Sequence, residues 1–138
     1  MGDIQQLFES FKIYYDQFNQ QSIVSKKYDN VVLITYASGR PIYYLNQMLL
    51  AKSAHDHGID RIVHYSPNDI DTKFYQANKK ILAAQRGGGY WLWKPYIILE
   101  AMNRFSENTI ILYLDTDCYI KPDIDPLINL VEQYERVL

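Results

Sequence analysis

Two carboxylates separated by a single residue, Asp115 and Asp117, are the side chains best placed to do chemistry. They directly follow residues 110–114, a run of five apolar or aromatic residues. Such a run is typical of a strand buried on both faces of a parallel sheet. An unpaired charge inside that strand would be very costly, so the carboxylates must lie where the strand emerges. Ligands bind at this carboxyl edge in open α/β sheets. Because carboxylates are hard oxygen ligands, the pair predicts a divalent cation, Mg²⁺ or Mn²⁺, held against a diphosphate.

The segment of residues 86–95, with the sequence RGGGYWLWKP, is the second candidate for chemistry. Its glycines match neither the dinucleotide-binding pattern nor the Walker A loop. Three glycines cannot continue a helix cheaply, so we expect a loop that ends where Lys94 and Pro95 open a helix. One interpretation is that backbone amides and Lys94 reach an anionic group at this helix N-terminus. A plain flexible turn is the alternative.

The remaining pattern predicts the elements that must position these residues. A run rich in β-branched residues predicts a strand at residues 31–36, and a second, shorter strand is predicted at residues 61–65. The first strand leads through small residues into a helix that begins at Pro41. Strand, helix and strand form a βαβ unit, so the fold class is α/β, Rossmann-like, with a mostly parallel sheet flanked by helices. Residues 1–28 are expected to form an amphipathic helix (3–21) and a loop, and residues 29–138 the α/β domain. The other predicted elements are helices at 41–57, 69–85, 94–105 and 125–138, a strand at 109–114 and a short edge strand at 118–121.

Composition limits the possible partners. At 138 residues the chain is expected to form one domain, and a net charge of −2 without a basic cluster argues against nucleic acid. No apolar run approaches the roughly 18 residues of a membrane span. The polar face of the first helix is mostly Gln, Asn and Asp, so docking on the domain is favoured over membrane-surface association. The single cysteine, Cys118, excludes an internal disulfide and fits a reducing compartment, and we expect a cytoplasmic protein.

These motifs together resemble a known group of enzymes. The apolar strand, Asp115-Thr116-Asp117 and the following Tyr119-Ile120-Lys121-Pro122 are similar to the D-x-D signature of GT-A-fold glycosyltransferases that use nucleotide sugars. Residues 89–95 resemble a segment upstream of the D-x-D in bacterial polysaccharide and lipopolysaccharide transferases. The resemblance covers about residues 30–128. It implies a metal-dependent transferase that takes a sugar from a nucleoside-diphosphate donor to a saccharide, lipid or protein acceptor.

The resemblance also implies a role for individual residues. Asp117 would bind the metal, and Asp115 the metal or the ribose. The remaining contacts it implies are Thr35, Tyr36 and Ala37 for the nucleobase and ribose, Arg86 and Lys94 for the diphosphate or donor sugar, and Gly89, Trp91 and Trp93 for the sugar. For the two tryptophans, packing in the core is the alternative, and for Arg86 a solvated charge at a helix end. Such enzymes continue well past the D-x-D with an acceptor-binding half, whereas 21 residues follow Asp117 here. We therefore expect the donor half alone, either as the N-terminal portion of a longer protein or as a reduced gene product.

Two other functions fit the same motif. One is a nucleotide-sugar-binding module without catalysis. The other is a phosphatase of the haloacid-dehalogenase type, in which Asp115 would be the nucleophile. That family usually has a small residue, Thr or Val where Tyr119 stands, and its motif opens the domain. No convincing Ser-His-Asp or Cys-His arrangement is present, and the catalytic residues are not identified by the sequence.

Overall fold

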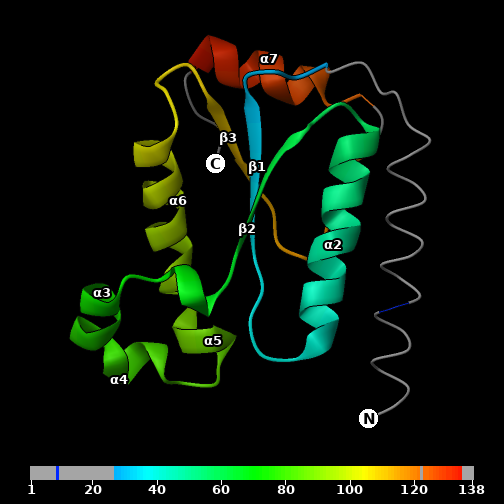
Figure 1. Cartoon of the computed structure of the whole chain (residues 1–138). Coiled ribbons are helices and arrows are strands. Elements are labelled where there is room, and N and C mark those ends of the chain that lie inside the picture. The colour runs from blue at the N-terminus through cyan, green and yellow to red at the C-terminus, as the bar shows by residue number, and fades with distance from the viewer. Residues whose placement is uncertain (1–8, 10–26, 122, 135–138) are drawn as a thin grey trace.

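A three-stranded, all-parallel sheet forms the centre of the computed structural model, which describes Glu9, residues 27–121 and residues 123–134 (Figure 1). The strand order is β2-β1-β3. Their bounds are β1 Val31–Tyr36, β2 Arg61–Tyr65 and β3 Ile110–Tyr113. The predicted α/β class and the strands predicted near residues 31–36, 61–65 and 109–114 are therefore confirmed. The prediction that residues 110–114 are buried on both faces is wrong, because β3 lies at an edge of the described sheet and its four residues are only partly buried. The closer likeness to the GT-A fold stays a prediction.

Helices cover both faces of this sheet (Figure 1). Because side chains alternate along a strand, Val31 and Leu33 pack in the cluster that contains Leu50 and Ala54 of helix α2 (Pro41–Asp56). Val32 and Ile34 instead pack with Trp93, Ile97 and Ala101 of helix α6 (Trp93–Arg104). Both faces of β1 are thus buried, which explains its continuous apolar sequence. The helices are α2 Pro41–Asp56, η1 Pro67–Asp69, α3 Thr72–Ala77, α4 Lys79–Leu82, α5 Gly87–Tyr90, α6 Trp93–Arg104 and α7 Asp125–Tyr134.

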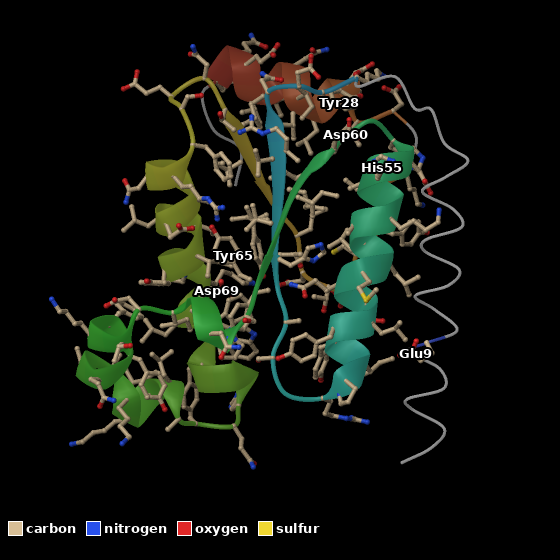
Figure 2. The ribbon with its side chains drawn as sticks, viewed as in Figure 1. Glu9, Tyr28, His55, Asp60, Tyr65 and Asp69 are labelled. Atoms are coloured by element: carbon tan, nitrogen blue, oxygen red, sulfur yellow. The ribbon has the colours of Figure 1, made fainter. Side chains whose placement is uncertain are left out.

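The last helix closes the end of the sheet where the strands begin. Asp125, the first residue of α7, accepts hydrogen bonds from Lys27 Nζ at 3.0 Å and from Tyr28 Oη at 2.5 Å. Figure 2 shows Tyr28 and Asp60 at this end, whereas Tyr65 and Asp69 lie toward the other. Ile128 of α7 packs in the core cluster that contains Val31 and Leu33 of β1. The carboxyl ends of the strands are therefore left to form a site.

Residues 118–121 form no strand, so the predicted edge strand is wrong. The Ile120 N–H donates to Ser53 Oγ of α2 at 2.9 Å instead of to a neighbouring strand. Ile120 is buried, and the residues on either side of it, Tyr119 and Lys121, are exposed. The alternation of apolar and polar residues therefore reflects a loop anchored on α2.

The predicted helix at residues 69–85 is broken into shorter pieces. α3 begins after Asp71, whose side chain accepts from the N–H groups of Lys73 and Phe74, and it ends at Asn78. α4 then starts at Lys79. The predicted helix at 3–21, apart from Glu9, and residues 135–138 lie outside the described residues. None of the helices in the described part of the chain is long and apolar enough to cross a membrane.

Candidate functional site

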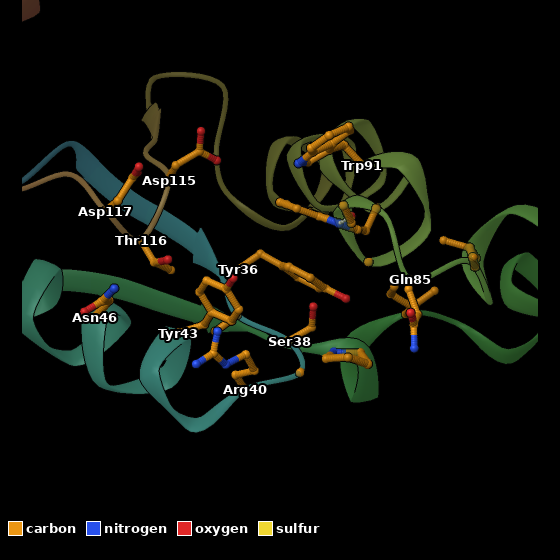
Figure 3. Close-up of a pocket in the computed structure, with 18 of the residues that line it drawn as sticks. Tyr36, Ser38, Arg40, Tyr43, Asn46, Gln85, Trp91, Asp115, Thr116 and Asp117 are labelled. Atoms are coloured by element: carbon orange, nitrogen blue, oxygen red, sulfur yellow. Dashed lines mark hydrogen bonds between the residues drawn. The ribbon is translucent and has the colours of Figure 1, made fainter.

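A cavity of about 950 Å³ opens at the carboxyl edge of the sheet (Figure 3). This volume is at the upper end of the range for small-molecule sites, roughly 300–1,000 Å³. Segments distant in the sequence supply its walls: the end of β1 and the loop after it, the first turns of α2, the region after β2, the glycine segment and the Asp-Thr-Asp. The location agrees with the rule that ligands bind beyond the carboxyl ends of parallel strands.

Asp115 and Asp117 lie on the wall of this cavity, just after β3, as the sequence predicted. The Cys118 N–H donates to the Asp115 carbonyl at 3.0 Å, and this tight turn places both carboxylates at the strand exit. Asp115 Oδ1 accepts a hydrogen bond from Tyr113 Oη and lies 3.2 Å from Lys94 Nζ. Burial, followed by the hydrogen bond to Asp115, raises the pKa of Tyr113, so this phenol stays a donor. The Asp115 charge is therefore partly compensated within the protein.

Asp117 is less engaged than Asp115. Among the described residues, its recorded side-chain contact is a weak one, to the Cys118 thiol at 3.9 Å. The Cys118 thiol has a raised pKa because of partial burial and the nearby carboxylates, and it stays in the neutral form. The Asp117 carboxylate is exposed to the cavity and available to a ligand.

The donor set suits a cation that arrives with an anionic ligand. Within residues 27–121 and 123–134, no cluster of three or more His, Cys, Asp or Glu side chains could hold a metal. Asp115 and Asp117 alone do not make a cage. Mg²⁺ is commonly held by one or two carboxylates together with substrate phosphates and water. The two aspartates fit that arrangement, with the remaining ligands supplied from outside the protein.

The end of β1 supplies two of the three residues that the resemblance implied for the nucleotide. Tyr36 and Ala37 line the cavity. Thr35 does not line it, because its side chain is fully buried in the central strand. The Thr35 carbonyl accepts from Gln47 Nε2 at 3.3 Å, while its hydroxyl has no hydrogen-bond partner among the described residues. Thr35 therefore lies beneath the site.

The glycine segment forms a left-handed turn. All five residues from Gly87 to Trp91 have a positive φ, between 51° and 101°. The Tyr90 and Trp91 N–H groups donate to the carbonyls four residues earlier, at 2.7 and 3.2 Å. A left-handed helical conformation costs about 1–2 kcal/mol for each residue with a Cβ. The three glycines make this turn possible, and Tyr90 and Trp91 are held in it by the surrounding packing.

Most amides of this turn are already hydrogen-bonded. The N–H groups of residues 88–92 and of Lys94 all donate to carbonyls of residues 85–91. These six amides are therefore not available to an anion in this conformation. The lysine itself is paired with Asp115.

The side chains of the turn divide between cavity and core. Gly87, Gly88 and Trp91 line the cavity, and Trp91 is 47% exposed. Gly89 is buried against Leu82 and does not line the cavity. Trp93 does both, since it lines the cavity but is only 6% exposed. Arg86 is exposed and lies outside the cavity lining.

Three cavity residues, Arg40, Tyr43 and Asn46, come from the start of α2 and were not singled out as site residues from the sequence. Arg40 is the N-cap of α2, makes no side-chain capping bond, and is followed by Pro41 at the first helical position. No acidic residue lies in the first turn. A helix N-terminus favours negative charge, so this corner is suited to an anion. The sequence signal that could have identified this corner was Pro41, which follows a predicted strand and Gly39 and marks a helix N-terminus.

Comparison of the chain with protein-family models, with curated proteins and with solved structures finds no match. The resemblance to glycosyltransferases therefore remains a prediction. It is carried by the sequence motifs alone.

Proposed function

We propose that the chain binds a nucleoside-diphosphate sugar together with Mg²⁺ or Mn²⁺ in the 950 Å³ cavity, as the donor-binding half of a metal-dependent glycosyltransferase. One observation carries this proposal: a single cavity at the carboxyl edge of a parallel sheet is lined by both aspartates of the D-x-D and by residues from the end of β1 and the start of α2. These residues are Asp115, Asp117, Tyr36, Ala37 and Arg40.

The cavity offers different chemistry on its different sides. Figure 3 shows Asp115, Thr116 and Asp117 gathered on one side, Gln85 on the other, and Tyr36 and Ser38 between them. The carboxylates suit a cation, whereas the Arg40 guanidinium and the α2 N-terminus suit phosphate oxygens. A ligand with a diphosphate and a cation at one part, and polar or stacking rings elsewhere, matches this distribution.

Such an arrangement suits the chemistry of sugar transfer. Departure of the nucleoside diphosphate develops negative charge on the leaving oxygens, which a bound divalent cation neutralises as a Lewis acid. In our proposal Asp117 and the second oxygen of Asp115 hold that cation. Arg40 pairs with the diphosphate, and the aromatic wall of Tyr36 and Trp93 keeps water from one side of the ligand. In this proposal these residues position the donor. They neither bind the acceptor nor act as a catalytic base.

The non-catalytic binding module is the second candidate. One observation favours it: among the described residues that line the cavity, Asp115 and Asp117 are the only carboxylates, and no histidine joins them. If both aspartates hold a cation, neither is free to act as a general base. Slow hydrolysis of a UDP-sugar by the chain would support the transferase half, whereas tight binding without hydrolysis would support the module.

Calorimetry with UDP and GDP, each with and without Mn²⁺, tests the proposal. We expect binding that depends on Mn²⁺, and its loss when Asp115→Asn and Asp117→Asn are combined. Asp123→Asn is the matched control, because Asp123 is exposed, does not line the cavity and has a φ of 67° that asparagine tolerates. Nucleotide binding that is indifferent to Mn²⁺ or to the double substitution would contradict the metal assignment. Hydrolysis of p-nitrophenyl phosphate that is lost on Asp115→Asn would favour the phosphatase instead.

A further inference from the structure

Lys94 is held in a small cage on the edge of the candidate site. Its Nζ lies 3.2 Å from Asp115 Oδ1, 4.8 Å from the centroid of the Tyr113 ring and 5.8 Å from that of Trp93. An ammonium near the faces of two aromatic rings and beside a carboxylate is stabilised by all three. The Tyr113 hydroxyl donates to the same Asp115 oxygen, so Lys94, Tyr113 and Asp115 form one connected group.

The position of Lys94 in its helix makes this pairing informative. Lys94 is the second residue of α6, a helix of 12 residues without an acidic residue in its first turn. A positive charge near a helix N-terminus is opposed by the helix dipole. Helix preference therefore does not explain the lysine, whereas the contact with Asp115 does.

A divalent cation and Lys94 would compete for Asp115. With Oδ1 engaged by Lys94 and Tyr113, the ligand-free site offers a cation the other Asp115 oxygen and the Asp117 carboxylate, with an ammonium close by. A divalent cation bound to Asp115 would lie close to the Lys94 ammonium, and two neighbouring positive charges repel each other strongly in a partly buried site. An arriving diphosphate changes this balance, since it gives the ammonium a new anionic partner.

We propose that Lys94 is an exchangeable counter-ion, which neutralises Asp115 in the ligand-free protein and pairs with the diphosphate when a divalent cation takes Asp115. This inference rests on the proposed function, because it assigns the ligand the same diphosphate and cation. It adds that cation and nucleotide bind cooperatively and that Lys94 is the group that couples them. By linkage, each ligand then increases the affinity of the other by the same factor.

The test compares Lys94→Met, which keeps the length of the aliphatic side chain, with the wild-type protein. Free Mn²⁺ is titrated without nucleotide and followed by electron paramagnetic resonance. UDP and GDP are then titrated by calorimetry at zero and saturating Mn²⁺. We expect Lys94→Met to bind free Mn²⁺ about tenfold more tightly than the wild-type protein. The factor by which Mn²⁺ increases nucleotide affinity should be about tenfold smaller in Lys94→Met, a change in the range of typical coupling factors.

Two further variants separate the specific pair from general electrostatics. Lys121→Met removes the same charge from an exposed lysine four residues beyond Asp117 and outside the cavity lining, and we expect less than a twofold change in Mn²⁺ affinity. Lys94→Arg keeps the charge and should bind free Mn²⁺ as weakly as wild type. Circular dichroism of each variant verifies that it is folded before titration.

The outcomes distinguish this inference from the proposed function. If Lys94→Met binds free Mn²⁺ no more tightly than the wild-type protein, while Mn²⁺-dependent nucleotide binding persists, Lys94 is not a competing counter-ion and only this inference fails. If neither protein binds UDP or GDP at any Mn²⁺ concentration, the proposed function fails. An equal gain in Mn²⁺ affinity for Lys94→Met and Lys121→Met would also overturn the specific role of Lys94.

Discussion

The indole ring of Trp93 stacks on the phenol ring of Tyr36, with the ring centroids 3.9 Å apart and the planes 12° from parallel. The Trp93 Nε1–H also donates to the Gly87 carbonyl at 2.9 Å. One side chain thus joins the end of β1 to the left-handed glycine turn. Since both rings line the cavity, the shape of the candidate site and the stability of the fold depend on the same contact.

Substitution of Trp93 is expected to destabilise the protein strongly. Trp93→Ala should lower the free energy of unfolding by about 3–5 kcal/mol, because a nearly buried indole leaves a cavity. Trp93→Phe keeps a stacking ring but removes the donor to Gly87, and about 1–3 kcal/mol should be lost. Urea unfolding followed by circular dichroism measures both values. Trp91→Phe is the control, since Trp91 is half exposed, and it should cost less than about 1 kcal/mol. Equal losses at the two positions would contradict the account.

Tyr36 is expected to make stability fall at alkaline pH. Burial raises its pKa from 10.0 to about 12. Between pH 10 and 12 the unfolded chain has released this proton and the folded chain retains it. The contribution of Tyr36 is therefore complete below pH 10 and is lost as the pH rises, by about 1.4 kcal/mol per pH unit in that window. Tyr36→Phe keeps the ring but has no proton to lose.

Urea unfolding at pH 9, 10, 11 and 11.5 tests this sign. The free energy of unfolding of the wild-type protein should fall more steeply above pH 10 than that of Tyr36→Phe, and the two curves should run in parallel below pH 9.5. Other buried tyrosines titrate in both proteins and cancel in the difference. Identical slopes above pH 10 would show that Tyr36 ionises as readily in the folded chain as in the unfolded one.

The sheet and the placement of Asp115 and Asp117 at its carboxyl edge could be predicted because the sequence constrains them locally. The apolar run before Asp115 favours a strand that packs against the core, and two carboxylates have no stable place inside such a strand. Four of the six residues at 31–36 are β-branched, and Pro41 marks the start of α2. Each of these signals is contained within a few neighbouring residues.

The remaining features depend on contacts that spacing does not encode. Lys94 and Asp115 are 21 positions apart, and their pairing requires α6 and β3 to be placed first. The Ser53 hydroxyl that holds residue 120 lies 67 positions away. Three glycines indicate conformational freedom but not its handedness, and Tyr90 and Trp91 oppose a positive φ. Such long-range contacts decided where the predictions failed.

Gly89 is expected to be far less tolerant of substitution than Gly39. Both have a positive φ, of 101° and 82°. A Cβ at Gly89 would lie 2.6 Å from the Leu82 Cα and 3.0 Å from its carbonyl oxygen, which are backbone atoms that cannot move aside. A Cβ at Gly39 would meet nothing within 4 Å. Gly39→Ala should therefore cost about 1–2 kcal/mol from backbone strain alone, and Gly89→Ala clearly more, about 3 kcal/mol or above.

Thermal unfolding of the two alanine variants compares them directly. A loss at Gly89→Ala no larger than at Gly39→Ala would show that the contact with Leu82 relaxes without cost. Gly88→Ala is an intermediate case, because its Cβ would lie 2.9 Å from the Ser38 hydroxyl, which can rotate away. We expect its stability to fall between those of the other two.

Gln47 joins the carboxyl ends of two strands beneath the cavity. It is 5% exposed, and its Nε2 donates to the carbonyls of Thr35 at 3.3 Å and Tyr65 at 3.1 Å. In Gln47→Glu, an ionised carboxylate would face two carbonyl oxygens without a proton to donate, so the folded state should raise the pKa of this new glutamate. The raised pKa makes the variant most stable below the ordinary glutamate pKa of about 4.3, with a loss of stability as the pH rises.

Urea unfolding of Gln47→Glu at pH 4 and pH 7 measures this effect against the wild-type protein at each pH. We expect a small difference at pH 4 and a loss of about 2–4 kcal/mol at pH 7, as for a buried charge without a partner. Gln76→Glu, at an exposed position on α3, should show no such pH dependence. A Gln47→Glu variant as stable as wild type at pH 7 would mean that the strand ends open to admit water, and that the hydrogen bonds of Gln47 to the Thr35 and Tyr65 carbonyls do not hold the ends of β1 and β2 together.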